Sequence, residues 1–158
     1  MRKTILFLVL LFVTASTFAC TCKKLSVKKS YTNSNIIFVG RVVAVNEIER
    51  EQNFKVDGKL RSFPYKIFEY TFELAETIKG YTNKKSLRVF TESYHSSCGF
   101  TFELNKDYLV YSYFTNFYEL ASEPVNPFLH TDICTRTKLL SETKKSEFKK
   151  LYRYNRRN

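Results

Sequence analysis

Two cysteines, Cys20 and Cys22, stand one residue apart at the point where a leader segment ends, and this placement limits what the chain can fold into. Before them come a basic start, an unbroken apolar run over residues 5–13, and small residues up to Ala19. This order is typical of a secretory signal peptide, and the run is too short to span a bilayer comfortably. We therefore expect residues 1–19 to be removed by cleavage after Ala19, which makes Cys20 the first residue of a secreted, extracellular or periplasmic protein. An uncleaved membrane anchor is the alternative.

The remaining residues, 20–158, are enough for a single domain with a proper core. The whole chain contains 15 Phe and 11 Tyr, which favour strands. Its formal net charge of +11 at pH 7 suggests acidic surfaces among its partners without identifying one.

Four cysteines follow the leader: Cys20, Cys22, Cys98 and Cys134. An even number in an exported chain predicts two disulfides. A bond between Cys20 and Cys22 would be geometrically poor, so we expect each of them to be joined to a distant point of the chain. A zinc site built from all four cysteines is the alternative, although it would normally show two CxxC-like pairs. A further alternative is that the CxC pair takes part in thiol exchange.

The strands are expected where β-branched and aromatic residues gather or alternate with polar ones. They are residues 36–48, 65–78, 86–92, 100–104 and 107–114, with a further short strand near residues 117–120. The segments 100–104 and 107–114 are expected to form a hairpin. Gly40 predicts a bend or bulge in the first strand. Residues 49–63 are mostly polar and carry a turn signal at Asp57 and Gly58.

The segment before the first strand predicts one or two helical turns ending near residues 33–35, and residues 121–133 are expected to form a loop. The C-terminal residues 141–158 predict a helix capped by Ser141, with Glu142 at its positive end. Its narrow apolar face consists of Phe148, Leu151 and Tyr152. These elements together predict a mainly β fold: a five-stranded, OB-like Greek-key barrel with a short N-terminal and a C-terminal helix.

The sequence contains, in order, the Cys-Thr-Cys start, a short helix, IIFVGRVVAV, a long strand ending in IKG, SSCGF, YLVY, a late Cys134 and a basic C-terminal helix. Taken in this order, these features resemble the N-terminal domain of the tissue inhibitors of metalloproteinases and their bacterial single-domain relatives, in the netrin-like OB-fold group. The resemblance covers residues 20–158, and its most specific parts are the Cys-Thr-Cys start and SSCGF.

The resemblance implies the disulfides Cys20–Cys98 and Cys22–Cys134. It also implies that the protein inhibits zinc metalloendopeptidases: the α-amine and carbonyl oxygen of Cys20 would chelate the zinc of the protease and displace its activated water. Thr21 would enter the substrate pocket beside the zinc. Ser96 and Ser97 would extend the surface that contacts the protease. The chain would hold no cofactor of its own, and we expect a monomer.

Two other fates stay open. Cys20 could be lipidated, which would anchor the protein to the envelope and block its amine. The protein could also be a netrin-like binding module without inhibitory activity, which attaches to an anionic polysaccharide or lipid through the basic residues after Ser141. Export argues against nucleic acid as a partner.

Enzymatic activity has little support, because the sequence shows no spaced acid–base pair, no Ser-His-Asp pattern and no phosphate-binding glycine loop. The two histidines, His95 and His130, are isolated and have no carboxylates at the spacing of a metal-ligand motif. We therefore expect them to be surface or hydrogen-bonded residues rather than metal ligands.

Overall fold

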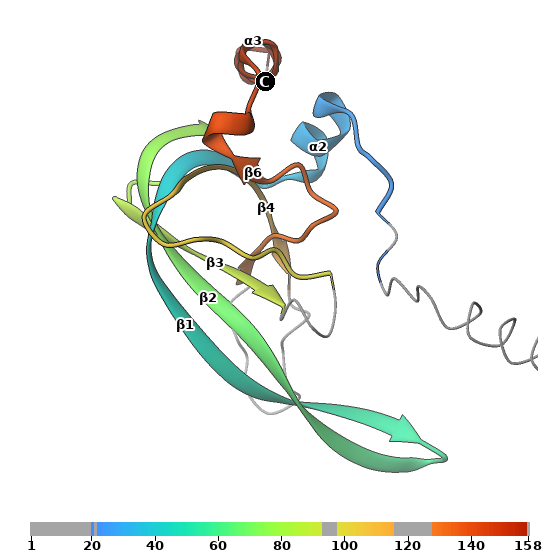
Figure 1. Cartoon of the computed structure of the whole chain (residues 1–158). Helices are drawn as coiled ribbons and strands as arrows, with labels where there is room; N and C mark the ends of the chain where they lie inside the picture. The colour runs from blue at the N-terminus through green and yellow to red at the C-terminus, as the bar shows by residue number, and fades with distance from the viewer. Residues whose placement is uncertain (1–19, 21, 93–97, 116–127, 158) are drawn as a thin grey trace, which may run out of the picture.

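The computed structural model describes residue 20 and residues 22–92, 98–115 and 128–157, without the side chains of residues 50–55 and 65 (Figure 1). The elements in chain order are α2 (Val27–Asn33), β1 (Ile36–Val56), β2 (Lys59–Lys79), β3 (Ser86–Glu92), β4 (Asp107–Thr115), β5 (Phe128–His130), β6 (Lys138–Leu139), the 3-10 turn η1 (Leu140–Glu142) and α3 (Lys145–Asn155). Within the described ranges, no helix has the length and apolar character needed to cross a membrane.

The strands form one six-stranded sheet in the order β1-β2-β3-β5-β4-β6, and β1 also pairs with β4. The sheet therefore curls, because β1 has β2 along one side and β4 along the other. In the described residues β3 and β5 share a single parallel pair, Phe90 with His130, so the sheet is curled rather than closed along full strands. The mainly β, OB-like class is confirmed. The sheet has six strands rather than the expected five, because residues 100–104 are not a strand and the short β5 and β6 leave no clear pattern in the sequence.

Strands β1 and β2 are longer than the sequence predicts and form a hairpin that extends well beyond the rest of the sheet (Figure 1). Residues 49–63 are not a connection between strands, and only their turn at Asp57 and Gly58, both with positive φ, was predicted correctly. The projecting part of the ribbon includes exposed side chains such as Leu60 (67% exposed) and Phe63 (48% exposed). Such a ribbon has little core to face, and its polar composition is therefore compatible with strands.

Gly40 lies at an irregularity of β1, as the sequence predicts. The register of the β1–β2 pair shifts between Val39 and Gly40. A Cβ atom at Gly40 would lie 2.9 Å from the backbone oxygen of Glu73 on β2, which is closer than real Cβ contacts allow. Glycine is therefore required where the two strands approach at the bend.

The aromatic core lies inside the curl of the sheet, and it explains why residues 100–104 are not a strand. Phe102 is buried, with its ring centroid 4.9 Å from that of Tyr70 and 5.0 Å from that of Phe72. The backbone N–H groups of Phe100 and Glu103 donate to side-chain oxygens instead of to a strand. The expected hairpin of 100–104 with 107–114 is therefore wrong: the alternating apolar residues reflect rings inserted into the core.

A second core cluster joins β1 and β4 to the two helices, which lie at the same end of the sheet (Figure 1). Tyr31 of α2 and Leu151 of α3 are buried in it against Leu109 and Tyr111 of β4. Helix α2 begins after Ser26, whose side chain accepts a hydrogen bond from the Lys29 N–H at 3.2 Å. The predicted N-terminal helix is thereby confirmed.

Two boundaries near the C-terminus differ from the expectation. Ser141 lies in η1 and does not cap α3, which begins at Lys145 after an extended Lys144 that makes no side-chain cap. The expected loop over residues 121–133 contains β5 in its described part. The strand expected near residues 117–120 lies outside the described residues.

Candidate functional site

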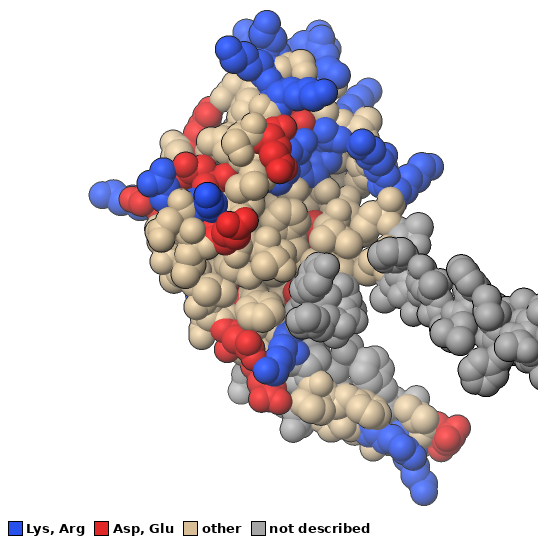
Figure 2. Space-filling model, viewed as in Figure 1, with Lys and Arg blue, Asp and Glu red and all other residues tan. Residues whose placement is uncertain are grey.

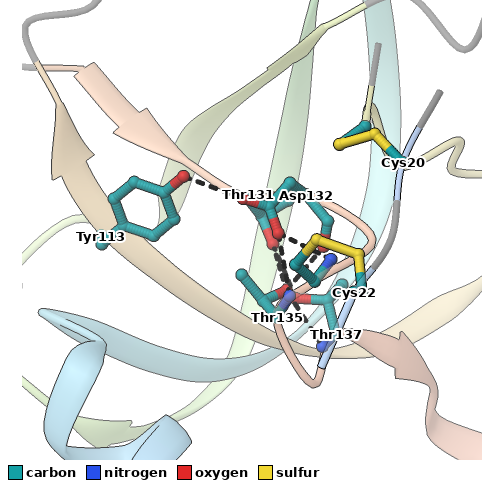
Figure 3. The surroundings of a disulfide bond; sticks show 9 residues. Cys20, Cys22, Tyr113, Thr131, Asp132, Thr135 and Thr137 are labelled. Atoms are coloured by element: carbon teal, nitrogen blue, oxygen red, sulfur yellow. Dashed lines mark hydrogen bonds between the residues drawn. A yellow bond between two sulfur atoms is a disulfide. The ribbon is translucent and has the colours of Figure 1, made fainter. Parts of the chain in front are cut away.

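The N-terminal segment is fastened by two disulfides at positions two residues apart (Figure 3). Cys20 is bonded to Cys98, 78 residues away, with their Cα atoms 5.6 Å apart. Cys22 is bonded to Cys134, 112 residues away, with their Cα atoms 5.0 Å apart. These are the two pairs that the family resemblance implies. The start of the domain is therefore fixed at two points, although chain termini are usually poorly ordered.

Of the four residues predicted for the inhibitory contact, the structure describes only Cys20, which is partly exposed beside Cys98. Thr21, Ser96 and Ser97 lie outside the described residues.

Residues 132–136, which we call the Cys134 segment, lie next to this N-terminal segment. Oδ1 of Asp132 accepts hydrogen bonds from the backbone N–H groups of Cys134 and Thr135, each at 2.8 Å. Oδ2 of Asp132 accepts a hydrogen bond from the Tyr113 hydroxyl at 2.9 Å. Figure 3 shows Tyr113 pointing from β4 toward Asp132. The turn that presents Cys134 is thus organised by one carboxylate, as in an Asx turn.

Threonine hydroxyls extend this network toward the core (Figure 3). The Thr131 hydroxyl is hydrogen-bonded with those of Thr135, at 3.0 Å, and Thr137, at 2.8 Å, and it donates to the backbone oxygen of Tyr111. Thr131 and Thr137 are buried, and their hydroxyls are paired as buried polar groups require. The Cys134 segment is therefore connected to β4 through more than its disulfide.

Arg136 connects the N-terminal segment with helix α3. Its Nη1 donates to the backbone oxygen of Leu25 at 2.8 Å, and its Nε and Nη2 donate to the carboxylate of Glu147 at 3.0 and 3.1 Å. Glu147 also accepts hydrogen bonds from Lys138 Nζ and from the Tyr111 hydroxyl. The Glu147 side chain is only 6% exposed, so this is a buried ion pair with its oxygens fully used.

The network shifts the pKa of several groups. Burial raises the pKa of Glu147, but hydrogen bonds from Arg136, Lys138 and Tyr111 outweigh it and lower the pKa from 4.5 to about 2. The stability that this carboxylate contributes is therefore complete above its ordinary pKa and is lost as the pH falls toward 2. Burial, and then the carboxylates of Asp132 and nearby Glu92, raise the pKa of Tyr113, which stays a neutral hydrogen-bond donor.

His130 was expected to be a surface or hydrogen-bonded residue. It is buried, with only 7% of the residue exposed. Burial lowers its pKa, so the imidazole is neutral at neutral pH. Among the residues that the structure describes, no group of three or more His, Cys, Asp or Glu side chains could hold a metal ion. His95 lies outside that part of the chain.

Sequence reasoning missed Asp132, Arg136 and Glu147. The Asp-x-Cys-Thr spacing of residues 132–135 was the one local signal, because it is compatible with an Asx turn. Arg136 and its partner Leu25 are 111 residues apart, and no local sequence pattern indicates their contact.

The curled OB-like sheet, with the N-terminal segment before it held by two disulfides, has the arrangement that the resemblance to the netrin-like group implies. The family model described as tissue inhibitor of metalloproteinase matches residues 18–155, and the chain therefore belongs to this family. The family is one of inhibitors rather than enzymes, and it implies metalloproteinases as partners in general terms. A search among curated proteins finds no match.

Proposed function

We propose that this protein is a secreted inhibitor of zinc metalloendopeptidases that acts through its own N-terminus after removal of residues 1–19. The family to which the chain belongs supports the class of function. The observation that carries the mechanism is the pair of disulfides at Cys20 and Cys22, which anchors the first residues that cleavage would leave.

The chemistry follows from what cleavage would create at Cys20. A free α-amine and the adjacent carbonyl oxygen offer nitrogen and oxygen to one metal ion, and both are ligand types that zinc accepts. A catalytic zinc has three protein ligands and an open position for water. Occupation of that position removes the water that the metal activates for hydrolysis. In this proposal Thr21 enters the substrate pocket, and Ser96 and Ser97 extend the contact.

The two disulfides would contribute to affinity by pre-organisation. A flexible terminus loses conformational freedom when it binds, and this loss reduces the net binding free energy. Anchors at Cys20 and Cys22 restrict the segment before any protease is present. Lipidation of Cys20 would exclude this mechanism, because it would consume the thiol and block the amine.

The proposal predicts a specific pH dependence of inhibition. The α-amine binds zinc only when deprotonated, and its pKa is about 7.7–8.0 in model peptides. The inhibition constant should therefore rise as the pH falls below this value, by about tenfold per unit. It should be measured between pH 8.5 and 6 on one protease, with a small inhibitor whose zinc ligand does not titrate in this range as the control. A profile parallel to the control would contradict chelation by the amine.

A second candidate function, binding of an anionic polysaccharide, is favoured by the charge at the helical end of the molecule. Figure 2 shows Lys and Arg side chains gathered over this end. Helices α2 and α3 lie together there, with the rings of Tyr31 and Tyr154 5.5 Å apart. The exposed basic residues of the two helices and of the two positions after α3 are Lys28, Lys29, Lys145, Lys149, Lys150, Arg153, Arg156 and Arg157. Both helices therefore contribute to one basic surface, beyond the C-terminal helix alone.

This second candidate predicts salt-sensitive retention on a heparin column. The double change Lys149→Glu and Lys150→Glu should lower the salt concentration of elution clearly, because exposed charges act through screened electrostatics. The matched control is Lys59→Glu with Arg61→Glu on the projecting hairpin, which makes the same change of net charge. Equal shifts for the two double variants would indicate a net-charge effect and no basic site. Binding to anionic vesicles but not to heparin would point to lipid instead.

A further inference from the structure

The Cys134 segment makes three separate attachments to the parts of the chain that hold the N-terminus. The Ile133 N–H donates to the backbone oxygen of Cys98 at 2.9 Å, which places the partner of Cys20. Cys134 is bonded to Cys22. Arg136 donates to the backbone oxygen of Leu25 at 2.8 Å. Residues 132–136 are therefore attached to both disulfides and to the segment that follows Cys22.

The conformation of these five residues depends on Asp132. Its carboxylate accepts the N–H groups of Cys134 and Thr135, and its backbone oxygen accepts the Thr135 hydroxyl at 2.8 Å. Hydrogen bonds to an ionised carboxylate are about twice as strong as those between neutral groups. The Tyr113 hydroxyl donates to the other carboxylate oxygen and so connects the turn to β4.

Two partly open pockets, of about 270 and 180 Å³, lie beside this turn, and Tyr113 and Asp132 line both of them. Cys98 lines the first pocket and Cys134 lines the second. Tyr113 and Asp132 therefore lie between a pocket at one disulfide and a pocket at the other.

We propose that Asp132, held by the Tyr113 hydroxyl, is a positioning residue that sets the location of Cys20 and Cys22 relative to the sheet. In this proposal Asp132 acts through the Cys134 turn, the Cys22–Cys134 disulfide and the Ile133–Cys98 hydrogen bond, and needs no contact with the protease. Its effect on inhibition rests on the proposed function, whereas its effect on the order of the N-terminal segment does not.

Hydrogen exchange on the free, processed protein tests the positioning directly. Asp132→Ala should raise the exchange rate of the Ile133 backbone amide, which donates to the Cys98 oxygen, by about tenfold or more, because local opening is no longer opposed by the turn. Asp132→Asn keeps a carbonyl oxygen for the two N–H groups and should stay within about threefold of the wild type. Tyr113→Phe removes only the outer hydrogen bond and should lie between them.

Two control variants lie elsewhere in the structure. Asp107→Ala removes a carboxylate from the exposed ion pair with Arg41, and Tyr152→Phe removes an exposed hydroxyl bonded to Glu76. Neither should change exchange at Ile133. Equal exchange at Ile133 in Asp132→Ala and Asp107→Ala would overturn the proposal, as would a uniform rise over the whole chain.

Inhibition is the second measurement and separates the two levels of the argument. Asp132→Ala should weaken inhibition by about 10–100-fold, the range for loss of a group that orients a metal ligand, and Asp132→Asn should restore it. Increased exchange without weaker inhibition would overturn the inhibitory role of the positioning. A wild-type protein that inhibits no metalloprotease would instead overturn the proposed function, and the exchange result would still decide the positioning.

Discussion

Acetylation or carbamylation of the Cys20 α-amine should abolish inhibition of a zinc metalloprotease. We expect a loss of at least about 1,000-fold in affinity, or about 4.1 kcal/mol. The modified nitrogen belongs to an amide after acetylation and to a urea after carbamylation, and in both its lone pair is delocalised and no longer available to the metal. The added group would also occupy the space in which the metal must lie. The measurement is the inhibition constant of the processed protein before and after modification, with the site of modification mapped by mass.

The control for this experiment uses the complex itself. Lysines such as Lys23 and Lys24 also react, although the lower pKa of an α-amine favours its modification near neutral pH. The same reagent applied to a preformed complex should modify exposed lysines while the metal protects the amine. Inhibitor recovered from that complex should keep its potency. Unchanged potency after complete modification of the free α-amine would contradict the chelation mechanism.

Replacement of Glu147 by alanine should destabilise the fold severely. The change leaves Arg136, Lys138 and the Tyr111 hydroxyl without their common partner in a site where the Glu147 side chain is only 6% exposed. Removal of one partner from a fully buried ion pair costs about 3–5 kcal/mol, and we expect the lower end of this range because Arg136 and Lys138 are partly exposed. Urea unfolding of the disulfide-bonded protein at pH 7 measures this loss as a fall in the free energy of unfolding.

Glu142→Ala is the matched control for the Glu147 variant. Glu142 is exposed and close to Glu147 in the sequence, and its removal should change the free energy of unfolding by no more than about 0.5 kcal/mol. If both variants lost the same small amount, the network around Glu147 would not be an important source of stability.

The sheet could largely be predicted from the sequence because β2 alternates and the buried parts of β1, β3 and β4 are continuous runs rich in β-branched and aromatic residues. Tyr70 and Phe72 are buried on one face of β2, and Glu73 is exposed on the other, which is the two-residue period seen in the sequence. The same rule failed at residues 100–104, where Phe102 enters the core from an irregular segment. It failed again along the projecting hairpin, where the polar composition of residues 49–63 hid the continuation of both strands.

The candidate site could be predicted only as far as its cysteines. Their number and the position of Cys20 and Cys22 lead to two disulfides through the chemistry of exported proteins. The groups that hold the Cys134 segment in place act across long separations, as in the contact of Arg136 with Leu25. Such contacts depend on how β4 and α3 pack, and no local spacing encodes them.

The account depends most directly on the chemical state of Cys20 in the secreted protein. Intact mass combined with a non-reduced peptide map would determine it. The account predicts a chain that begins at Cys20 with a free α-amine and contains Cys20–Cys98 and Cys22–Cys134 links. A diacylglyceryl mass on Cys20, or any residue retained before it, would contradict inhibition through the N-terminus and leave polysaccharide binding as the function to test.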